Sequence, residues 1–269
     1  MASRLGSLYM MSLRYGFDPR RTGSMVRGRW QVARDRRAFN AQRQASGHPE
    51  WFPDGASWPI PFERHDNAGT ASGHYFHQDL FVARAIFRQS PRRHIDVGSR
   101  IDGFVAHVAS FREVEVVDIR PMVSKVSGIR YVQADLMSEP PQDLSADSVS
   151  CLHALEHFGL GRYGDPVSYD GWERGLRALT SLVMPGGTLY LSVPTGQHQR
   201  VEFNAHRVFS LPFLRERLLQ SYAIDNLAFV DDGGDLHEDL DPYSPEAEIS
   251  YGAEYGCAIW TLRRSESTT

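Results

Sequence analysis

The sequence predicts a doubly wound α/β fold, in which a mostly parallel sheet of seven strands carries helices on both faces. Short apolar runs alternate with helical patterns from residue 93 onward, which is typical of parallel βαβ units. Three of these runs end near an acidic residue, at Asp96, Asp118 and Asp135. Strand ends of this kind form the ligand-binding edge of a doubly wound sheet.

A helical and irregular extension precedes the sheet. We expect an arginine-rich helix over 24–45, irregular chain over 46–73, and a second helix near 75–89. The strands are expected at 93–98, 114–119, 129–134, 148–153, 187–193, 223–230 and 255–263, with helices near 103–111 and 170–183. The predicted domains are therefore an extension over 1–89 and a sheet domain over 90–269.

The composition indicates a globular protein with one core. Of the 269 residues, 41% are hydrophobic, and no apolar run reaches the length of a membrane span. The N-terminus lacks the apolar segment of a signal peptide. Both cysteines, Cys151 and Cys257, lie in apolar strand-like runs, so no disulfide framework is predicted. We expect a cytoplasmic protein without a membrane partner, and the sequence predicts no particular oligomeric state.

The net charge of −4 conceals a strong asymmetry. Residues 1–50 carry ten arginines against three acidic residues, whereas 231–254 carry nine carboxylates and no basic residue except histidine. One interpretation is a solvated helix and an acidic loop. The other is an arm for an anionic substrate, such as a phosphorylated sugar or a nucleic acid.

The loop after the first strand indicates a cofactor without a pyrophosphate. Gly98 permits close approach of the backbone to a ligand. The loop from Gly98 to Gly103 has fewer glycines than a pyrophosphate site, and Asp102 would repel an anion. A neutral or cationic cofactor fits better, and S-adenosylmethionine is the common one. An ordinary strand–turn–helix with surface carboxylates is the alternative.

Two further strand ends suit the nucleoside part of that cofactor. Asp118 lies about twenty residues after the first loop, where a carboxylate can bind a ribose diol. Asp135 lies where an adenine amino group could be bound. The predicted cofactor-binding residues are Asp96, Gly98, Ser99, Asp118, Ile119, Asp135 and Leu136.

A cluster of imidazoles and one carboxylate is expected beside the cofactor. His153, Glu156 and His157 share one face if the loop after the fourth strand is helical. The adjacent loop, after the fifth strand, supplies His206. These four are the predicted metal ligands, and three nitrogens with one carboxylate suit zinc, manganese, iron or cobalt better than magnesium. Without metal, His157 or His206 could act as general base.

Glycines bracket a polar segment just beyond these residues. Gly161 and Gly164 permit bends that would turn Arg162, Tyr163 and Asp165 toward the cofactor. We expect this segment to form a wall of the acceptor pocket, with forked hydrogen bonds from Arg162 to an anionic or hydroxyl-rich acceptor. An exposed surface loop is the alternative.

The motifs resemble those of a known superfamily. Asp96-Val-Gly98, Asp118, Asp135 and the turn Pro185-Gly-Gly187 resemble the class I S-adenosylmethionine-dependent methyltransferases over roughly residues 90–263. Longer phrases resemble a bacterial family that is catalogued as a domain of unknown function and grouped with these enzymes: His74-Tyr-Phe-His-Gln-Asp79, Asp96–Phe104, Leu155–Asp165 and Phe203-Asn-Ala-His-Arg207. The resemblance implies a Rossmann-like methyltransferase fold and S-adenosylmethionine, and it implies no substrate.

A second, partial resemblance concerns chemistry. Ubiquinone-pathway O-methyltransferases and small-RNA 2′-O-methyltransferases carry E-x-x-E-H at the same place, and the RNA enzymes add a histidine after the fifth strand. Those motifs hold a divalent metal that binds vicinal oxygens. Glu156, His157 and His206 match them, while His153 replaces the first glutamate.

Together these features predict an S-adenosylmethionine-dependent O-methyltransferase that acts on a hydroxyl of a small molecule or glycan, with or without a divalent transition metal. The basic arm favours RNA 2′-O-methylation as the alternative. Binding of the cofactor without catalysis is another. A nicotinamide dehydrogenase would need a phosphate loop that the sequence lacks.

Overall fold

The structure of the protein is a computed structural model that describes residues 19–53, 55, 58–61, 64, 68–138 and 144–266. The first eighteen residues, over which we expect no signal peptide, lie outside the described residues. The chain forms two compact units, Met1–Thr70 and Ala71–Thr269. Within the described residues, no helix has both the length and the apolar character that spanning a membrane requires.

The first unit contains the helix α2 (Pro19–Ala45), which confirms the arginine-rich helix expected over 24–45. Its large apolar residues Trp30 and Phe39 are exposed. Asp35 forms ion pairs with Arg34 and Arg64 at 3.3 and 2.9 Å. The described surface of α2 therefore carries both charged residues and exposed aromatic residues.

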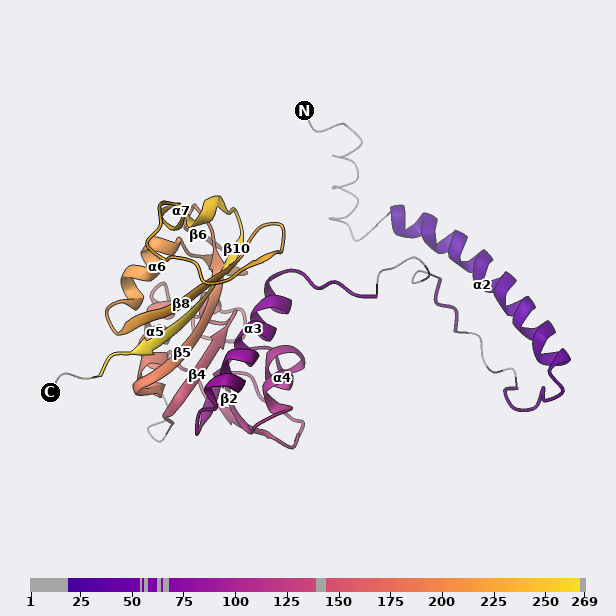
Figure 1. The fold of residues 1–269 in the computed structure, drawn as a ribbon, viewed down its shortest axis with the longest axis horizontal. Coiled ribbons are helices and arrows are strands. Elements are labelled where there is room, and N and C mark those ends of the chain that lie inside the picture. Colours follow the sequence, from indigo (N-terminus) through magenta and orange to yellow (C-terminus); the bar gives the residue numbers. More distant parts are fainter. Residues whose placement is uncertain are drawn as a thin grey trace, which may run out of the picture. The chain divides into compact units, whose positions relative to one another are not determined.

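The second unit is built on a sheet whose strand order is β3-β2-β1-β4-β5-β10-β8-β9 (Figure 1). The first five of these strands run parallel, and β10 runs antiparallel to both of its neighbours, β5 and β8. The strands of this sheet are β1 (His94–Val97), β2 (Val114–Asp118), β3 (Ile129–Gln133), β4 (Ala146–Leu152), β5 (Val183–Thr195), β8 (Tyr222–Val230), β9 (Leu236–His237) and β10 (Gly256–Arg264). All seven expected strands are present, and β9 adds a two-residue edge strand.

Helices cover both faces of the sheet, as predicted. The helices α3 (His74–Gln89) and α4 (Ala106–Ala109) bury their apolar residues in one core cluster, and α5 (Gly171–Leu182) and α6 (Leu211–Leu218) bury theirs in another. Figure 1 shows the two pairs on opposite sides of the strands. All four residues of β1 and the first four of β2 are buried, although each strand includes charged or polar residues.

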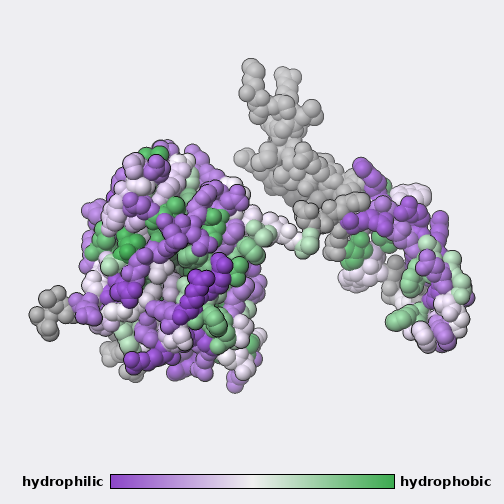
Figure 2. All heavy atoms as spheres, in the orientation of Figure 1, coloured by the Kyte–Doolittle hydropathy of each residue, from purple (hydrophilic) through white to green (hydrophobic). Residues whose placement is uncertain are grey.

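The boundary between the units lies earlier in the chain than the expected 89/90. Helix α3 belongs to the second unit, because Val82, Ala83 and Ile86 are buried against Phe104 and Val108. The helix therefore faces the core with these three residues, whereas Phe76, Leu80 and Phe87 are exposed. In the space-filling view, hydrophilic residues cover most of the visible face of this unit (Figure 2).

Several short elements were not predicted. The helix expected near 103–111 consists of a π-helical turn, η2 (Ile101–Val105), that continues into α4. A hairpin of β6 (Arg200–Glu202) and β7 (His206–Val208) follows β5 and precedes α6. The remaining short helical elements are η3 (Leu155–His157), α7 (Pro245–Glu248) and η4 (Ser250–Gly252). The hairpin and η3 lie beside the candidate site.

Candidate functional site

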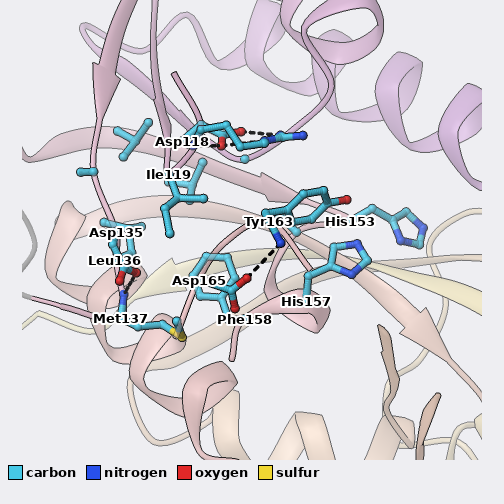
Figure 3. A pocket seen from close by; sticks show the side chains of 16 residues that line it. Asp118, Ile119, Asp135, Leu136, Met137, His153, His157, Phe158, Tyr163 and Asp165 are labelled. Atoms are coloured by element: carbon cyan, nitrogen blue, oxygen red, sulfur yellow. Dashed lines mark hydrogen bonds and ion pairs between the residues drawn. The ribbon is translucent and has the colours of Figure 1, made fainter. Parts of the chain in front are cut away.

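A pocket opens at the carboxyl ends of β1, β2, β3 and β4 (Figure 3). Asp118 and Asp135 lie toward one end of this pocket, and the imidazoles of His153 and His157 lie toward the other. The lining residues are Val97, Gly98, Val117, Asp118, Ile119, Arg120, Ala134, Asp135, Leu136, Met137, His153, Ala154, His157, Phe158, Tyr163 and Asp165. Five of the seven predicted cofactor-binding residues are among them.

Gly98 forms the turn between β1 and the pocket. Its φ is +70°, in the left-handed region that favours glycine, and its N–H donates to the carbonyl of Val117 at 2.9 Å. A Cβ on Gly98 would lie 2.9 Å from the Cβ of Ala154. Glycine is thus required both by the backbone conformation and by the close approach of the loop after β4.

Asp96 and Ser99 are predicted cofactor-binding residues, but neither lines the described pocket. The buried carboxylate of Asp96 accepts hydrogen bonds from the hydroxyls of Ser99 and Ser150, each at 2.6 Å, and from the Ser99 N–H at 3.1 Å. Burial raises the pKa of Asp96 from its ordinary 3.8 to about 6, against the effect of these hydrogen bonds. Asp96 and Ser99 therefore hold the turn after β1 by hydrogen bonds within the protein and do not line the pocket.

Asp118 and Asp135 present carboxylates at the expected strand ends. Asp118 accepts from the backbone N–H of Arg120 at 2.8 Å and from its Nε and Nη2 at 2.9 and 2.5 Å. Asp135 accepts from the Met137 N–H at 2.9 Å and from the Ser138 hydroxyl at 3.0 Å. Carboxylate oxygens can accept more than one hydrogen bond, so both residues retain capacity for hydroxyl or amino donors.

Asp165 organises the segment that follows η3. Its carboxylate accepts from the N–H groups of Gly159, Gly161 and Tyr163 at 2.8, 3.2 and 3.1 Å. The Tyr163 ring thereby lies in the pocket wall, with the guanidinium of Arg120 4.5 Å from its centroid. Tyr163 and Asp165 thus line this pocket, and the carboxylate of Asp165 is used to hold the loop.

Arg162 does not line the described pocket. Its Nη1 donates to the carbonyl of Ala205 at 2.9 Å, and the residue is exposed. The expectation that Arg162 forms part of the pocket wall is therefore wrong for this conformation. The hairpin of β6 and β7, which was not predicted, supplies that carbonyl and holds the guanidinium 5.2 Å from the ring centroid of Tyr163, on the outside of the pocket wall.

The loop after β4 brings His153, Glu156 and His157 together. Glu156 is buried, and its Oε1 lies 2.8 Å from His153 Nδ1 and 3.6 Å from His157 Nε2. His157 Nδ1 lies 2.7 Å from the carbonyl of Ala205, which assigns the proton to Nδ1 and leaves Nε2 as an acceptor. Burial lowers the pKa of His157, so its imidazole is neutral near pH 7.

His206 does not join this cluster. Its Nε2 lies 3.1 Å from Glu202 Oε2, and its ring lies 5.1 Å from the ring of Tyr255. The four predicted metal ligands therefore do not form one group. The reason is the β6–β7 hairpin, which pairs His206 with Glu202 across its two strands.

A different group of donors converges instead. Among the described residues, donor atoms of His74, His153 and Cys257 all lie within 4.8 Å of one another. Neither His74 nor Cys257 is among the site residues predicted from the sequence. His74 opens one of the phrases that carry the family resemblance, whereas Cys257 appears in the sequence only as a cysteine in an apolar strand.

Comparisons with known proteins find one family model that matches part of the chain. Residues 109–222 match the family described as "Caenorhabditis protein of unknown function, DUF268". No curated protein matches the chain.

Similar solved structures cover 70–77% of the chain at 10–15% identity. The N-methyltransferase NodS from Bradyrhizobium japonicum WM9, in complex with S-adenosyl-L-homocysteine, has a TM-score of 0.49 and 11% identity over 77% of this chain and 92% of its own. The [4+2]-cyclase SpnF has a TM-score of 0.48 and 15% identity over 70% and 82%. An S-adenosylmethionine-dependent methyltransferase from Clostridium acetobutylicum ATCC 824 has a TM-score of 0.48 and 10% identity over 71% and 92%.

The strand order is the more direct evidence for the fold. Five parallel strands in the order β3-β2-β1-β4-β5 are followed by an antiparallel β10 inserted beside β8. The chain therefore has the Rossmann-like fold of the class I methyltransferases, and over residues 109–222 it is similar to a family of unknown function.

Proposed function

We propose that the protein is an S-adenosylmethionine-dependent O-methyltransferase that acts on a hydroxyl of a small molecule or glycan. The observation that carries this proposal is the pocket that joins Gly98, Asp118 and Asp135 at one end to His153 and His157 at the other. One of the similar structures is a [4+2]-cyclase, so the proposal is based on the residues of the pocket rather than on the fold.

The polar residues of the pocket suit the parts of this cofactor. Asp118 would accept hydrogen bonds from the ribose hydroxyls, and Asp135 from the adenine amino group. Ile119 and Leu136 follow these carboxylates and would contact the adenine ring. Gly98 would allow the methionine end to approach the backbone.

His157 is the proposed general base. When bound, S-adenosylmethionine would supply a methyl group activated by a positively charged sulfur. His157 Nε2 would accept the proton of the acceptor hydroxyl as that oxygen takes the methyl group, and S-adenosylhomocysteine would be the leaving group. The hydrogen bond from Nδ1 to the Ala205 carbonyl fixes the tautomer that this step needs. A divalent metal near His153 would assist by lowering the pKa of the acceptor hydroxyl.

Calorimetry and methyl transfer test the proposal together. S-adenosylhomocysteine should bind the purified protein, and NADH should not. Radiolabelled methyl groups should pass from S-adenosylmethionine to members of a panel of catechols and glycans. With an acceptor from that panel, His157→Ala should lower turnover by about 100-fold or more, because general bases contribute that much. Its affinity for S-adenosylhomocysteine should stay close to that of the wild type.

A matched control separates the catalytic role of His157 from the general effect of replacing a histidine by alanine. His237 is exposed and pairs with Asp231 away from the pocket, so His237→Ala should leave turnover unchanged. Failure to bind S-adenosylhomocysteine would overturn the assigned cofactor. Binding without transfer to any acceptor would favour a non-catalytic protein.

RNA 2′-O-methylation is a second candidate, which one observation favours. The helix α2 carries arginines along its length and few acidic residues, as a phosphate-binding surface would. Including short single-stranded RNAs in the acceptor panel tests this candidate. Label in RNA that falls steeply with added salt would replace the small-molecule proposal.

A further inference from the structure

Three residues from distant parts of the sequence meet beside the pocket. His74 lies at the start of α3, His153 lies just after β4, and Cys257 lies in β10. Their donor atoms are all within 4.8 Å of one another. Cys257 is a buried free cysteine, so its sulfur is not used in a disulfide.

The buried imidazole of His153 has a free nitrogen. The side chain is 3% exposed, and its Nδ1 lies 2.8 Å from the Glu156 carboxylate. Its Nε2 is buried and makes no hydrogen bond within the described part of the chain. If Nδ1 carries the proton toward Glu156, Nε2 presents a lone pair. Histidines that bind metals characteristically donate their other N–H to a carboxylate in this way.

The two imidazoles are as far apart as a shared ion requires, but one ring must turn to bind it. The ring centroids of His74 and His153 lie 5.2 Å apart, and the rings are stacked with 7° between their planes. Zinc lies about 2.1 Å from each ligating nitrogen, so two imidazoles on one tetrahedral ion have centroids roughly 5 Å apart. Because a ligating nitrogen holds its lone pair in the plane of its ring, one of the stacked rings must rotate before both lone pairs point at one ion. The ring of Tyr255 lies 5.3 Å from that of His74 on one side and 5.1 Å from that of His206 on the other. His206 therefore contacts Tyr255, a neighbour of His74, and is not itself part of the group of three.

From this geometry we infer that His74, His153 and Cys257 form a site for a divalent transition metal, zinc being the best match. Two imidazole nitrogens and one thiolate favour zinc or cobalt over magnesium and calcium. Three protein ligands leave a fourth position open, as in catalytic zinc sites. Glu156 orients His153 from behind and is not a ligand.

The open position has a role that rests on the proposed function. His153 also lines the cofactor pocket, so a ligand bound at the fourth position would lie near the site of methyl transfer. A metal there would bind the oxygen of the acceptor hydroxyl and lower its pKa, which would make proton transfer to His157 easier. This ligand set replaces the one predicted from sequence and shares only His153 with it.

Metal binding by the chelator-treated protein, in the presence of a thiol-free reductant, tests the inference. Titration with Zn²⁺ alone should give one site per chain by calorimetry. Titration with Co²⁺ should give a thiolate-to-cobalt charge-transfer band in the near ultraviolet, which requires Cys257 or the other cysteine, Cys151, as a ligand. Cys257→Ser should abolish the band, and Cys151→Ser should retain it, since Cys151 lies in the other core cluster.

The two histidines that contact Tyr255 form a matched pair of variants. His74→Ala should weaken Zn²⁺ binding by about 100-fold or more, because loss of even an outer partner of a metal ligand costs 10–100-fold. His206→Ala should leave the affinity within about threefold of the wild type. Circular dichroism and thermal melting would establish that each variant folds, and the cobalt spectrum of the wild type needs no variant at all.

The possible results separate this inference from the proposed function. Absence of the charge-transfer band in the wild type, or equal effects of His74→Ala and His206→Ala, would overturn the metal site. If the wild-type protein shows no metal site but still binds S-adenosylhomocysteine, the proposed function stands without the metal. Zinc binding through His74 and Cys257 in a protein that does not bind S-adenosylhomocysteine would support the metal site and reject the cofactor.

Discussion

Replacing Gly98 by alanine tests the packing of the turn after β1 in isolation from any ligand. The substitution adds one methyl group and no charge. It forces an L-residue into a backbone conformation with φ of +70°. It also brings the new Cβ to 2.9 Å from the Cβ of Ala154, which is shorter than real Cβ contacts.

The two effects can be given separate magnitudes. An L-residue in the left-handed region costs about 1–2 kcal/mol. Overpacking a well-packed site costs about 1–3 kcal/mol more. Gly98→Ala should therefore lower the free energy of unfolding by about 2–5 kcal/mol, a large share of the stability of a typical domain.

Urea denaturation of the wild type and four variants measures the conformational cost and the overpacking cost separately. Gly164 also has a positive φ, of +85°, but no heavy atom lies within 4 Å of the position of its Cβ. Gly164→Ala should therefore cost only the conformational part. Ala154→Gly removes the opposing methyl group, so the double variant Gly98→Ala with Ala154→Gly should recover the overpacking cost. Equal destabilisation by Gly98→Ala and Gly164→Ala would refute the reasoning from the contact.

Two other predictions concern carboxylates. Asp118→Ala should weaken binding of S-adenosylhomocysteine by at least about tenfold in calorimetry, since a hydrogen bond to a charged group contributes about 1.5–3 kcal/mol. The control is Asp102→Ala, which removes an exposed carboxylate outside the pocket and should leave the affinity for S-adenosylhomocysteine unchanged. Unchanged affinity in Asp118→Ala would reject the assigned ribose contact. The pKa of Asp96 is raised from 3.8 to about 6 by burial, so between these pH values the folded protein binds more protons at this residue than the unfolded protein does. Stability should therefore fall as the pH rises from about 4 to about 6, by up to roughly 3 kcal/mol from this residue. The free energy of unfolding of Asp96→Asn should lack this part of the pH dependence, and parallel pH profiles of the two proteins would contradict the assignment.

The strands of the sheet could be predicted because their sequence signal is local. The run expected over 114–119 forms the buried strand β2 (Val114–Asp118), and the run expected over 129–134 forms the edge strand β3 (Ile129–Gln133). Both are short segments rich in β-branched and aromatic residues, which are visible without any knowledge of the partner strands.

The hairpin beside the site could not be predicted in the same way. Its strands β6 and β7 have three residues each, which is too short for an alternating pattern to be visible. The consequence for the site is large, because this hairpin pairs His206 with Glu202 and supplies the Ala205 carbonyl to His157 and Arg162. Two of the predicted catalytic residues, His206 and Arg162, are displaced from the pocket for this reason.

The group of His74, His153 and Cys257 required the tertiary structure. Local spacing led to His153, Glu156 and His157, which are neighbours in sequence. His74 and Cys257 reach the same place only because α3 packs on the sheet and β10 pairs with β5. Nothing in the local sequence around His74 or Cys257 predicts that the two residues lie close together.

The position of β10 within the sheet has a consequence for folding. β10 follows every other strand in the sequence, yet eight of its residues pair with β5 on one side and eight with β8 on the other. Until it arrives, two interior strands present unpaired edges of the kind that associate with other chains. Such non-local pairing is slow to form. Cys257 therefore reaches the two histidines only when β10 has paired with β5 and β8.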